Sequence, residues 1–363
     1  MFCRVYLIDT PYHIDRPFDY SCGENVREGD IVRVPFGRAT RIGVVVGISD
    51  ECDESISDEI VIKPITAVIC QTFRLNREML GLASFIKDYT LCTFGEAVKT
   101  ILPPGAFNDV LNIRYRKTCK LMLDRIGAAT LLSASGKSGI RSEGQRSIVR
   151  YLMNIGEADT DLIKQLPGVT SAHISALKDK GIISISESED IRNPYKGYAN
   201  ERDTSPIALS SAQTVAYETI ESLYSEASAK AALLYGVTGS GKTKVIMKAI
   251  DKTLADGKSV IMLVPEISLT PQTVNIFCKR YGERVAVIHS SLSQGERMDA
   301  WRRIHRGDVD LVIGTRSAIF APLDNIGMIV IDEEHEHTYK SESDPKYHYE
   351  GILNAMKTAA SHM

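Results

Sequence analysis

The sequence predicts a multidomain α/β protein: a small β-rich unit first, a helical unit second and a parallel-sheet unit last. Residues 1 to about 105 hold short β-branched runs separated by turn residues. Residues 207–363 instead alternate apolar strand-like runs with helical patterns. With 363 residues, the chain is long enough for about two to three domains.

Composition excludes several classes of protein. Apolar content of 44% and charged content of 25% are ordinary for a globular protein. No apolar run approaches the roughly 18–20 residues of a membrane span, and the N-terminus lacks a signal-peptide core, so we expect a cytoplasmic protein without membrane contact. A net charge of −3 disfavours wholesale coating of nucleic acid and leaves room for a local basic groove. Single, scattered cysteines predict reduced thiols and no zinc site: Cys3, Cys22, Cys52, Cys70, Cys92, Cys119 and Cys278.

The first unit, residues 1–105, combines strands with one helix. Strands are predicted at Asp30–Pro35 and Gly43–Ile48, with a turn between them. The run Ile60–Cys70 contains Pro64 and therefore predicts an edge or bent strand. Apolar spacing predicts a helix over Asn76–Tyr89, and Leu102-Pro-Pro-Gly105 predicts a domain boundary.

Residues 106–190 have the order of a winged-helix domain. Ser142-x-x-Gln145 predicts a capping box that starts a helix, and further helices are predicted at Asp159–Leu166 and Ser171–Lys180, before a β-prone hairpin. In that fold the third helix is the usual DNA reader, here with Ser171, His173, Ser175 and Lys178. A protein-binding or spacer role stays equally open. Residues 191–206 are polar, with breaks, and predict a linker.

The last unit, residues 207–363, opens with a phosphate-binding pattern. An apolar run, Ala231–Tyr235, predicts a strand that leads into G-x-x-x-x-G-K-T and then a helix. Backbone N–H groups of such a loop point at phosphates, its lysine reaches the terminal phosphates, and its threonine hydroxyl meets Mg²⁺. The pattern therefore predicts a site for a nucleoside triphosphate and Mg²⁺ at Gly236, Val237, Thr238, Gly239, Ser240, Gly241, Lys242 and Thr243. The strand–loop–helix context disfavours a chance glycine-rich turn.

Four further strands follow, and the last of them ends in acidic residues. The runs are Ser259–Val264, Val285–His289, Leu311–Gly314 and Met328–Ile331, with helical patterns at Gln272–Tyr281 and Gly295–Arg306. A βα succession predicts a parallel sheet with ligands at the carboxyl ends of its strands. Asp332 is then expected to hold Mg²⁺ and Glu333 to orient the attacking water. A solvated acidic turn is the alternative.

Neighbouring sequences favour a helicase over a small-molecule P-loop kinase. Gln213 lies about 25 residues before the loop, where helicases keep a glutamine that grips adenine. Leu263–Thr273, His289-Ser290 and Gly314–Ser317, which includes Arg316, resemble strand-end contacts to a single-stranded backbone. Hydroxyls, an arginine and helix-start amides bind phosphates without reading bases.

Taken in order, these motifs resemble the PriA family of bacterial primosome-assembly DNA helicases along the whole chain. The matching stretches are FDY at 18–20, RVPFG at 33–37, LPPG at 102–105, GVTGSGKT at 236–243, LVPEISLTPQT at 263–273, GTRSAIF at 314–320 and DEEHEHTYK at 332–340. The resemblance implies a RecA-like lobe of a superfamily 2 ATPase that unwinds DNA 3′-to-5′. It implies recognition of stalled or branched forks and restart of replication.

The resemblance also implies DNA-binding residues and partners. Capture of a 3′ end is implied for the first unit by Phe18, Asp19, Tyr20, Gly37 and Lys63. An aromatic-rich loop at Tyr339–Glu350, with Tyr347 and His348, is implied to couple DNA binding to ATP hydrolysis, although Lys346 replaces the usual arginine. Implied partners are forked and single-stranded DNA, single-stranded DNA-binding protein and other primosome proteins. We expect a nucleoid-associated monomer.

Part of the family pattern lies outside this chain. The family continues into a second RecA-like lobe with arginine fingers and into cysteine pairs for zinc, neither of which these 363 residues contain. Because ATP hydrolysis needs an arginine worth roughly 10³–10⁵ in rate, we expect very slow turnover by this chain alone. A non-catalytic module that binds DNA forks is therefore the main alternative.

Overall fold

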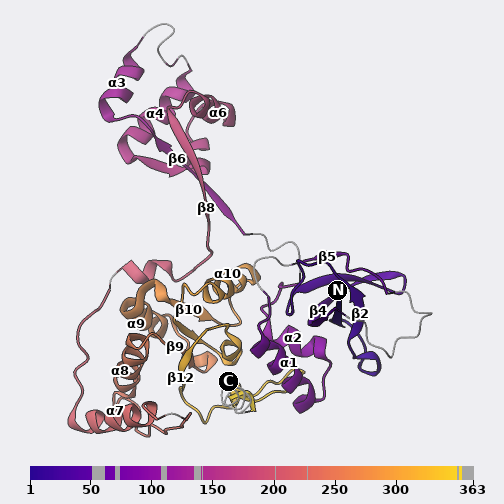
Figure 1. Ribbon diagram of the computed structural model, residues 1–363. Coiled ribbons are helices and arrows are strands. Elements are labelled where there is room, and N and C mark those ends of the chain that lie inside the picture. Colours follow the sequence, from indigo (N-terminus) through magenta and orange to yellow (C-terminus); the bar gives the residue numbers. More distant parts are fainter. Residues whose placement is uncertain are drawn as a thin grey trace. The chain divides into compact units, whose positions relative to one another are not determined.

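The computed structural model describes residues 1–50, 62–69, 74–107, 113–134, 140, 142–200, 202–226, 228–349 and 351–353, with only the backbone of 199–200. The chain forms two compact units (Figure 1). The larger joins Met1–Leu111 to Arg192–Met363, and the smaller is Asn112–Ile191. No helix in the described ranges is long and apolar enough to cross a membrane.

The N-terminal part of the larger unit is a small barrel, whose strand pairs are antiparallel and whose closing bridge between Ser21 and Pro64 is parallel. Its strands lie in the order β2-β1-β4-β3-β5. Ser21 closes the sheet, because its N–H donates to the carbonyl of Lys63 and its carbonyl accepts from Ile65, each at 3.0 Å. The predicted strands near 30–35 and 43–48 are confirmed, whereas the first two strands were not predicted. The strands are β1 (Phe2–Leu7), β2 (Phe18–Ser21), β3 (Ile31–Phe36), β4 (Ala39–Ser49) and β5 (Ala67–Val68).

Two helices follow the barrel. Helix α1 (Arg77–Thr90) starts where Asn76 Oδ1 accepts the N–H of Met79 at 2.8 Å, and it buries the apolar face predicted from the sequence. Helix α2 (Phe94–Ile101) was not predicted, although Thr93 and Glu96 form a capping box before it. Gly95 brings α2 so close to β1 that an added Cβ would lie 2.1 Å from the Ile8 carbonyl oxygen.

The C-terminal part of the larger unit is a parallel-sheet lobe, as the sequence predicts. All pairings are parallel and the strand order is β10-β11-β9-β12. The strands are β9 (Ser259–Leu263), β10 (Val285–Ile288), β11 (Leu311–Gly314) and β12 (Ile326–Ile331). The helices are α7 (Ser211–Tyr224), α8 (Lys242–Ala255), α9 (Pro271–Tyr281) and α10 (Gln294–His305).

The barrel helices and the lobe share one hydrophobic core. Buried side chains of α1 and α2, such as Ala83 and Val98, belong to the same cluster as Leu263, Trp301 and Phe320 of the lobe. The Leu102–Gly105 segment, predicted as a domain boundary, therefore lies inside the larger compact unit. The chain passes between the two units after Leu111 and again before Arg192.

The predicted strand at Ala231–Tyr235 is wrong. The segment forms no strand, and Tyr235 is 93% exposed. A strand is stable only with a hydrogen-bonding neighbour and a cover for its side chains, and apolar composition supplies neither. In the described residues the sheet ends at β12, whose six residues are all half-buried.

The smaller unit combines four helices with a three-stranded antiparallel sheet. Its elements are β6 (Tyr115–Leu121), α3 (Arg125–Ser133), α4 (Glu143–Ile155), β7 (Glu157–Asp159), α5 (Thr160–Lys164), α6 (Ser171–Asp179) and β8 (Ile183–Glu189). The three predicted helices correspond to α4, α5 and α6. The predicted terminal hairpin is wrong, because β8 pairs along its length with β6, which precedes all the helices.

The predicted capping box at Ser142 is also wrong. Ser142 does precede α4, but its hydroxyl forms no cap and lies 3.0 Å from His173 Nε2. Nδ1 of the same ring accepts the N–H of Thr170 at 3.2 Å. His173 lies on α6, next to the start of α4. Its ring contacts the Ser142 hydroxyl, which therefore does not cap the helix backbone, and both ring nitrogens have partners within the unit.

Gly95→Ala should lower the free energy of unfolding by about 2–3 kcal/mol, because the added methyl group forces α2 away from β1. Gly81→Ala is the matched control, since Gly81 is an exposed glycine inside α1 with open space around its Cβ position. That change should raise stability by about 1 kcal/mol. Thermal unfolding followed by circular dichroism measures both, and equal effects of the two changes would contradict the close packing.

Candidate nucleotide and nucleic-acid site

The carboxyl ends of the four parallel strands lie along one edge of the sheet. This edge carries the residues that follow each strand, namely Glu266 after β9, His289 after β10, Arg316 after β11 and Asp332 after β12. The register makes these ends adjacent, because Ile288 pairs with Gly314, Gly314 with Leu263, and Leu263 with Ile331. Parallel sheets bind ligands at this edge. We refer to it below as the strand-end rim.

The phosphate loop enters helix α8 through a left-handed glycine. Gly239 and Gly241 both have φ of +82°, and α8 starts at Lys242. The Lys242 ammonium group donates to the carbonyl of Gly236 at 2.7 Å. Thr243 follows it and is exposed. The loop thus presents a lysine and the positive end of a 14-residue helix, which are groups that bind phosphate.

Gln213 lies against this loop although it is distant in sequence. Its side-chain Nε2 donates to the carbonyl of Ser240 at 2.9 Å, and its Oε1 accepts the N–H of Ser210 at 2.9 Å. A Cβ at position 241 would lie 2.4 Å from that Nε2 and displace the flexible amide, and the φ of +82° itself favours glycine there. The structure brings Gln213 to the loop, and its contact with adenine stays a prediction.

Asp332 is held at the end of β12 in a partly buried position. Its backbone N–H donates to the Leu263 carbonyl at 2.9 Å, and its Oδ1 accepts the N–H of Glu333 at 3.1 Å. Burial raises the pKa of the Asp332 carboxyl, and the charge of Glu333 raises it further. The charge of Lys242 lowers the same pKa, so the two predicted catalytic groups act on each other electrostatically.

The chemistry of these groups fits a magnesium nucleoside triphosphate. Lys242 and the start of α8 supply positive charge for phosphates, whereas Asp332 and Glu333 supply the carboxylate oxygens that Mg²⁺ prefers. Glu333 has a φ of +46°, which is rare for a residue with a side chain and typical of functional sites.

Hydrogen bonds link neighbouring positions of the strand-end rim. The Ser290 hydroxyl donates to Glu266 Oε1 at 3.1 Å. Arg316 donates to the carbonyl of Lys340 at 2.8 Å, which ties the rim to the predicted aromatic-rich loop. These two contacts therefore join motif residues of four sequence segments in two pairs.

The aromatic-rich loop packs against the lobe. Tyr339 is buried, and its hydroxyl donates to the carbonyl of Asp332 at 2.5 Å. Tyr347 is only 4% exposed, its ring lies 5.1 Å from that of Phe320, and burial raises its pKa to about 12. Of the two predicted DNA contacts in this loop, Tyr347 is thus enclosed by protein, whereas His348 is partly exposed.

Strand β2 carries the predicted pocket of the barrel. Phe18 is half-buried, with its ring 5.1 Å from Phe36. Tyr20, by contrast, is 4% exposed in the barrel core and donates to the Pro35 carbonyl at 3.2 Å, so only Phe18 is open for stacking on a base. The other predicted pocket residues lie near β2 or on it: Asp19 opposite Arg4, exposed Lys63 beside Ser21, and Gly37 in the turn after β3.

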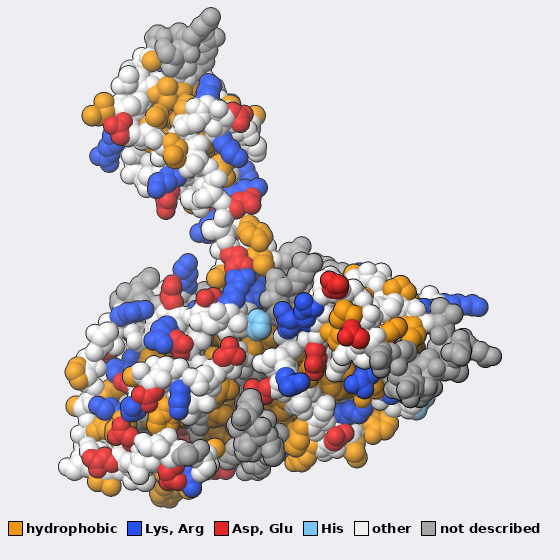
Figure 2. Space-filling model, viewed as in Figure 1, with side chains coloured by type: hydrophobic (Ala, Val, Ile, Leu, Met, Phe, Trp, Pro, Cys, Tyr) orange, Lys and Arg blue, Asp and Glu red, His pale blue; other side chains and the backbone are white. Residues whose placement is uncertain are grey.

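Charges of both signs are interspersed over the visible face of the larger unit (Figure 2). This distribution agrees with the small net charge of −3. Contacts to nucleic acid are therefore expected from a few positioned groups rather than from a broad basic surface.

The lobe and the barrel together define the class of protein. Residues 212–362 match the family of DEAD/DEAH box helicases. Residues 6–103 match the 3′DNA-binding domain (3′BD) of PriA. The chain thus joins a lobe of the DEAD/DEAH box helicase family to a domain that matches the 3′DNA-binding domain of PriA.

Curated relatives assign the chain to one family within this class. Three of them are called replication restart protein PriA. The relative from Bacillus subtilis (strain 168) is 34% identical over 99% of this chain and 52% of its own length. The relative from Haemophilus influenzae is 31% identical over 95% of this chain and 46% of its own length. The relative from Treponema pallidum is 42% identical over 46% of this chain and 25% of its own length. The chain belongs to the PriA family of replication restart proteins. It spans about half the length of curated relatives that match nearly all of it.

Asp332→Asn should raise the melting temperature by roughly 1–3 °C. The pKa of this carboxyl is higher in the folded state, so its ionised form costs stability above that pKa. The gain should vanish below the ordinary aspartate range, where the carboxyl is protonated in the folded and unfolded states alike. Differential scanning fluorimetry from pH 4 to 8 measures it, with exposed Asp324→Asn as control. A lower melting temperature at pH 8 would contradict the assigned burial.

Proposed function

We propose that this chain is the DNA-end-binding and ATP-binding half of a helicase that restarts replication at stalled or branched forks and unwinds DNA 3′-to-5′. The observation that carries the proposal is the meeting of the phosphate loop, Asp332 and the strand-end rim at one edge of a lobe whose core continues into the barrel. DNA held by the barrel and the rim would then lie on the same compact unit as the nucleotide.

Each group has a proposed role. Lys242 and the loop amides bind the phosphates, Thr243 and Asp332 hold Mg²⁺, and Glu333 orients the attacking water. The bound Mg²⁺ neutralises charge on the phosphates. Gln213 recognises the base. Arg316 and His348 contact the DNA strand, as does Tyr347 once its packing opens.

In the barrel, Phe18 would stack on the terminal base of a 3′ end. Lys63 would meet its phosphate, and Asp19 and Gly37 would line the pocket. The relatives are about twice as long as this chain, and we propose that the remaining half of such a protein completes the motor. Single-stranded DNA-binding protein and other primosome proteins are proposed partners of the whole protein, and this chain is proposed to hydrolyse ATP very slowly by itself.

Lys242→Ala should weaken binding of a fluorescent ATP analogue with Mg²⁺ at least about tenfold, because a charge-assisted contact to phosphate is lost. Lys244→Ala is the matched control, since Lys244 is exposed on the same first turn of α8 and is not one of the residues predicted to bind the nucleotide. Fluorescence anisotropy measures both. Equal affinities for the two variants would refute the nucleotide site.

A forked DNA with a free 3′-hydroxyl should bind more tightly than the same fork blocked by a 3′-phosphate. Phe18→Ala should weaken binding of the free end about tenfold, since base stacking is worth roughly 1–3 kcal/mol, and should abolish the difference between the two ends. Tyr12→Ala is the control, because Tyr12 is an exposed aromatic residue of the same barrel outside the pocket. Equal affinity of the wild-type chain for both ends would argue against end capture.

A further inference from the structure

Tyr195, which belongs to no sequence motif, hydrogen-bonds a residue of the strand-end rim. Its hydroxyl oxygen lies 2.6 Å from Nε2 of His289, the residue that directly follows β10. The two rings meet edge to face, with centroids 6.2 Å apart. Tyr195 lies in the segment after Arg192, where the chain re-enters the larger unit.

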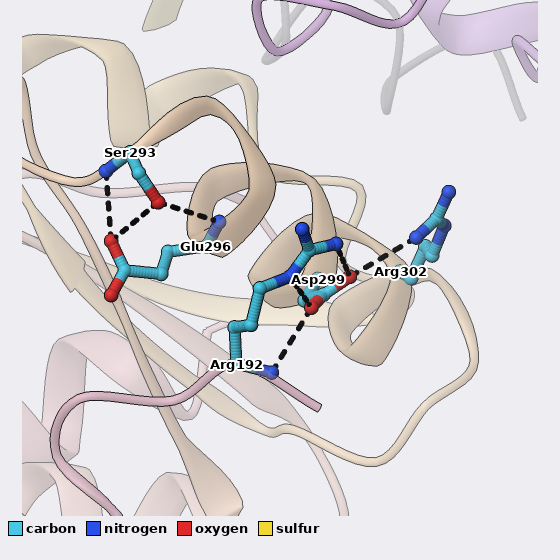
Figure 3. Close-up of polar contacts among 5 residues, drawn as sticks. All are labelled: Arg192, Ser293, Glu296, Asp299 and Arg302. Atoms are coloured by element: carbon cyan, nitrogen blue, oxygen red, sulfur yellow. Dashed lines mark hydrogen bonds and ion pairs between the residues drawn. The ribbon is translucent and has the colours of Figure 1, made fainter. Parts of the chain in front are cut away.

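This segment is fixed firmly enough to position a side chain. Arg192 donates to the buried carboxylate of Asp299 on α10 from its backbone N–H at 3.0 Å, from Nε at 2.6 Å and from a terminal nitrogen at 3.1 Å. Arg302 donates to the same carboxylate at 3.0 Å, and Glu296 completes a capping box with Ser293 at the start of the helix (Figure 3). Tyr195 follows this anchor after two residues.

The hydrogen bond between Tyr195 and His289 couples the hydroxyl to the tautomer of the imidazole ring. Within the described ranges, Nε2 is the only hydrogen-bond partner of the Tyr195 hydroxyl, and which of the two atoms donates depends on the tautomer of the ring. A phenol that donates to Nε2 needs that nitrogen to be bare. The proton of a neutral ring then resides on Nδ1. No described group hydrogen-bonds Nδ1, and His289 is partly exposed beside exposed Ser290.

The surroundings of His289 favour the neutral ring. Burial lowers its pKa, as does the charge of Arg297, whereas Glu296 and Glu266 act in the opposite direction. The charged or titratable groups around the ring thus come from three elements. Glu296 and Arg297 belong to α10, Glu266 to the turn after β9, and Tyr195 to the re-entry segment. A neutral ring can offer exactly one N–H to a ligand.

We propose that Tyr195 is a positioning residue for DNA: it locks His289 in the Nδ1–H tautomer, so that this N–H donates to a phosphate oxygen of a single strand lying along the strand-end rim. The inference rests on the proposed function, since the rim must carry the strand. It adds a residue of the re-entry segment to that contact and assigns the proton that His289 uses.

The tautomer is tested directly by long-range ¹H–¹⁵N correlation spectra of the ¹⁵N-histidine-labelled chain from pH 5 to 9. The chain has eight histidines, and His289→Gln identifies the signal. In the wild-type chain, Nε2 should have the shift of a bare nitrogen and Nδ1 that of a protonated one. A protonated Nε2 at neutral pH would overturn the proposal, and this measurement needs no Tyr195 variant that folds.

Tyr195→Phe should raise the pKa of His289, because the lost hydroxyl stabilises the neutral ring. Tyr198→Phe is the matched control: its ring lies 5.9 Å from that of Tyr195 in the same segment, and it should leave the His289 signals unchanged. Unchanged His289 signals in Tyr195→Phe would also overturn the proposal.

Binding of a fluorescent oligothymidylate separates this inference from the function on which it rests. At pH 8, His289→Ala and Tyr195→Phe should each weaken binding about two- to tenfold, and the double variant should be no weaker than His289→Ala, because Tyr195 acts only through that ring. Additive losses would overturn the positioning role. A wild-type chain that binds no oligothymidylate would refute DNA binding by the rim, whatever the tautomer.

Discussion

The parallel register of β9 to β12 is the constraint on which every group of the strand-end rim depends. Because the four strands run the same way and end together, residues separated by up to about 65 positions in the sequence meet at one edge. Any strand running in the opposite direction would send its motif to the far side of the sheet. The position of the rim therefore depends on the direction of the strands, and its chemistry depends on the residues that follow them.

Packing joins this edge to the DNA-binding barrel. The same cluster of buried side chains contains residues of α1 and α2, the strands of the lobe, and Tyr339 of the aromatic-rich loop. Tyr339 in turn holds the Asp332 carbonyl. Asp332 and the barrel helices are thus connected through contacts within one packed core.

Partial burial has opposite effects on the two kinds of titratable group at the rim. It raises the pKa of Asp332 and lowers that of His289, which in both cases disfavours the charged form. The nearby charge of Lys242 favours ionised Asp332, as a bound Mg²⁺ would, whereas the proposed hydrogen bond donated by Tyr195 would favour a neutral His289. The nucleotide end of the rim is thus suited to strong charge interactions, and the β10 end to a neutral hydrogen bond.

Local patterns in the sequence determined much of the lobe by themselves. The four strands, α9, α10 and the left-handed glycines of the phosphate loop follow from apolar periodicity and from residues with few conformational choices. The motif residues could also be named in advance, since phosphate and Mg²⁺ chemistry restricts the residue types. The PriA-family assignment was likewise reached from these motifs.

Tertiary structure alone decided the rest, because it depends on partners distant in the chain. Ala231–Tyr235 has the composition of a strand, but no strand in the described residues pairs with it. Tyr20 is one of two aromatic residues on β2, and its ring is turned into the barrel core. The Ser142 hydroxyl contacts the imidazole of His173, 31 residues away, instead of forming the predicted helix cap. Tyr195 gives no signal in the sequence, since its only distinction is a histidine 94 residues away that the fold brings to its hydroxyl.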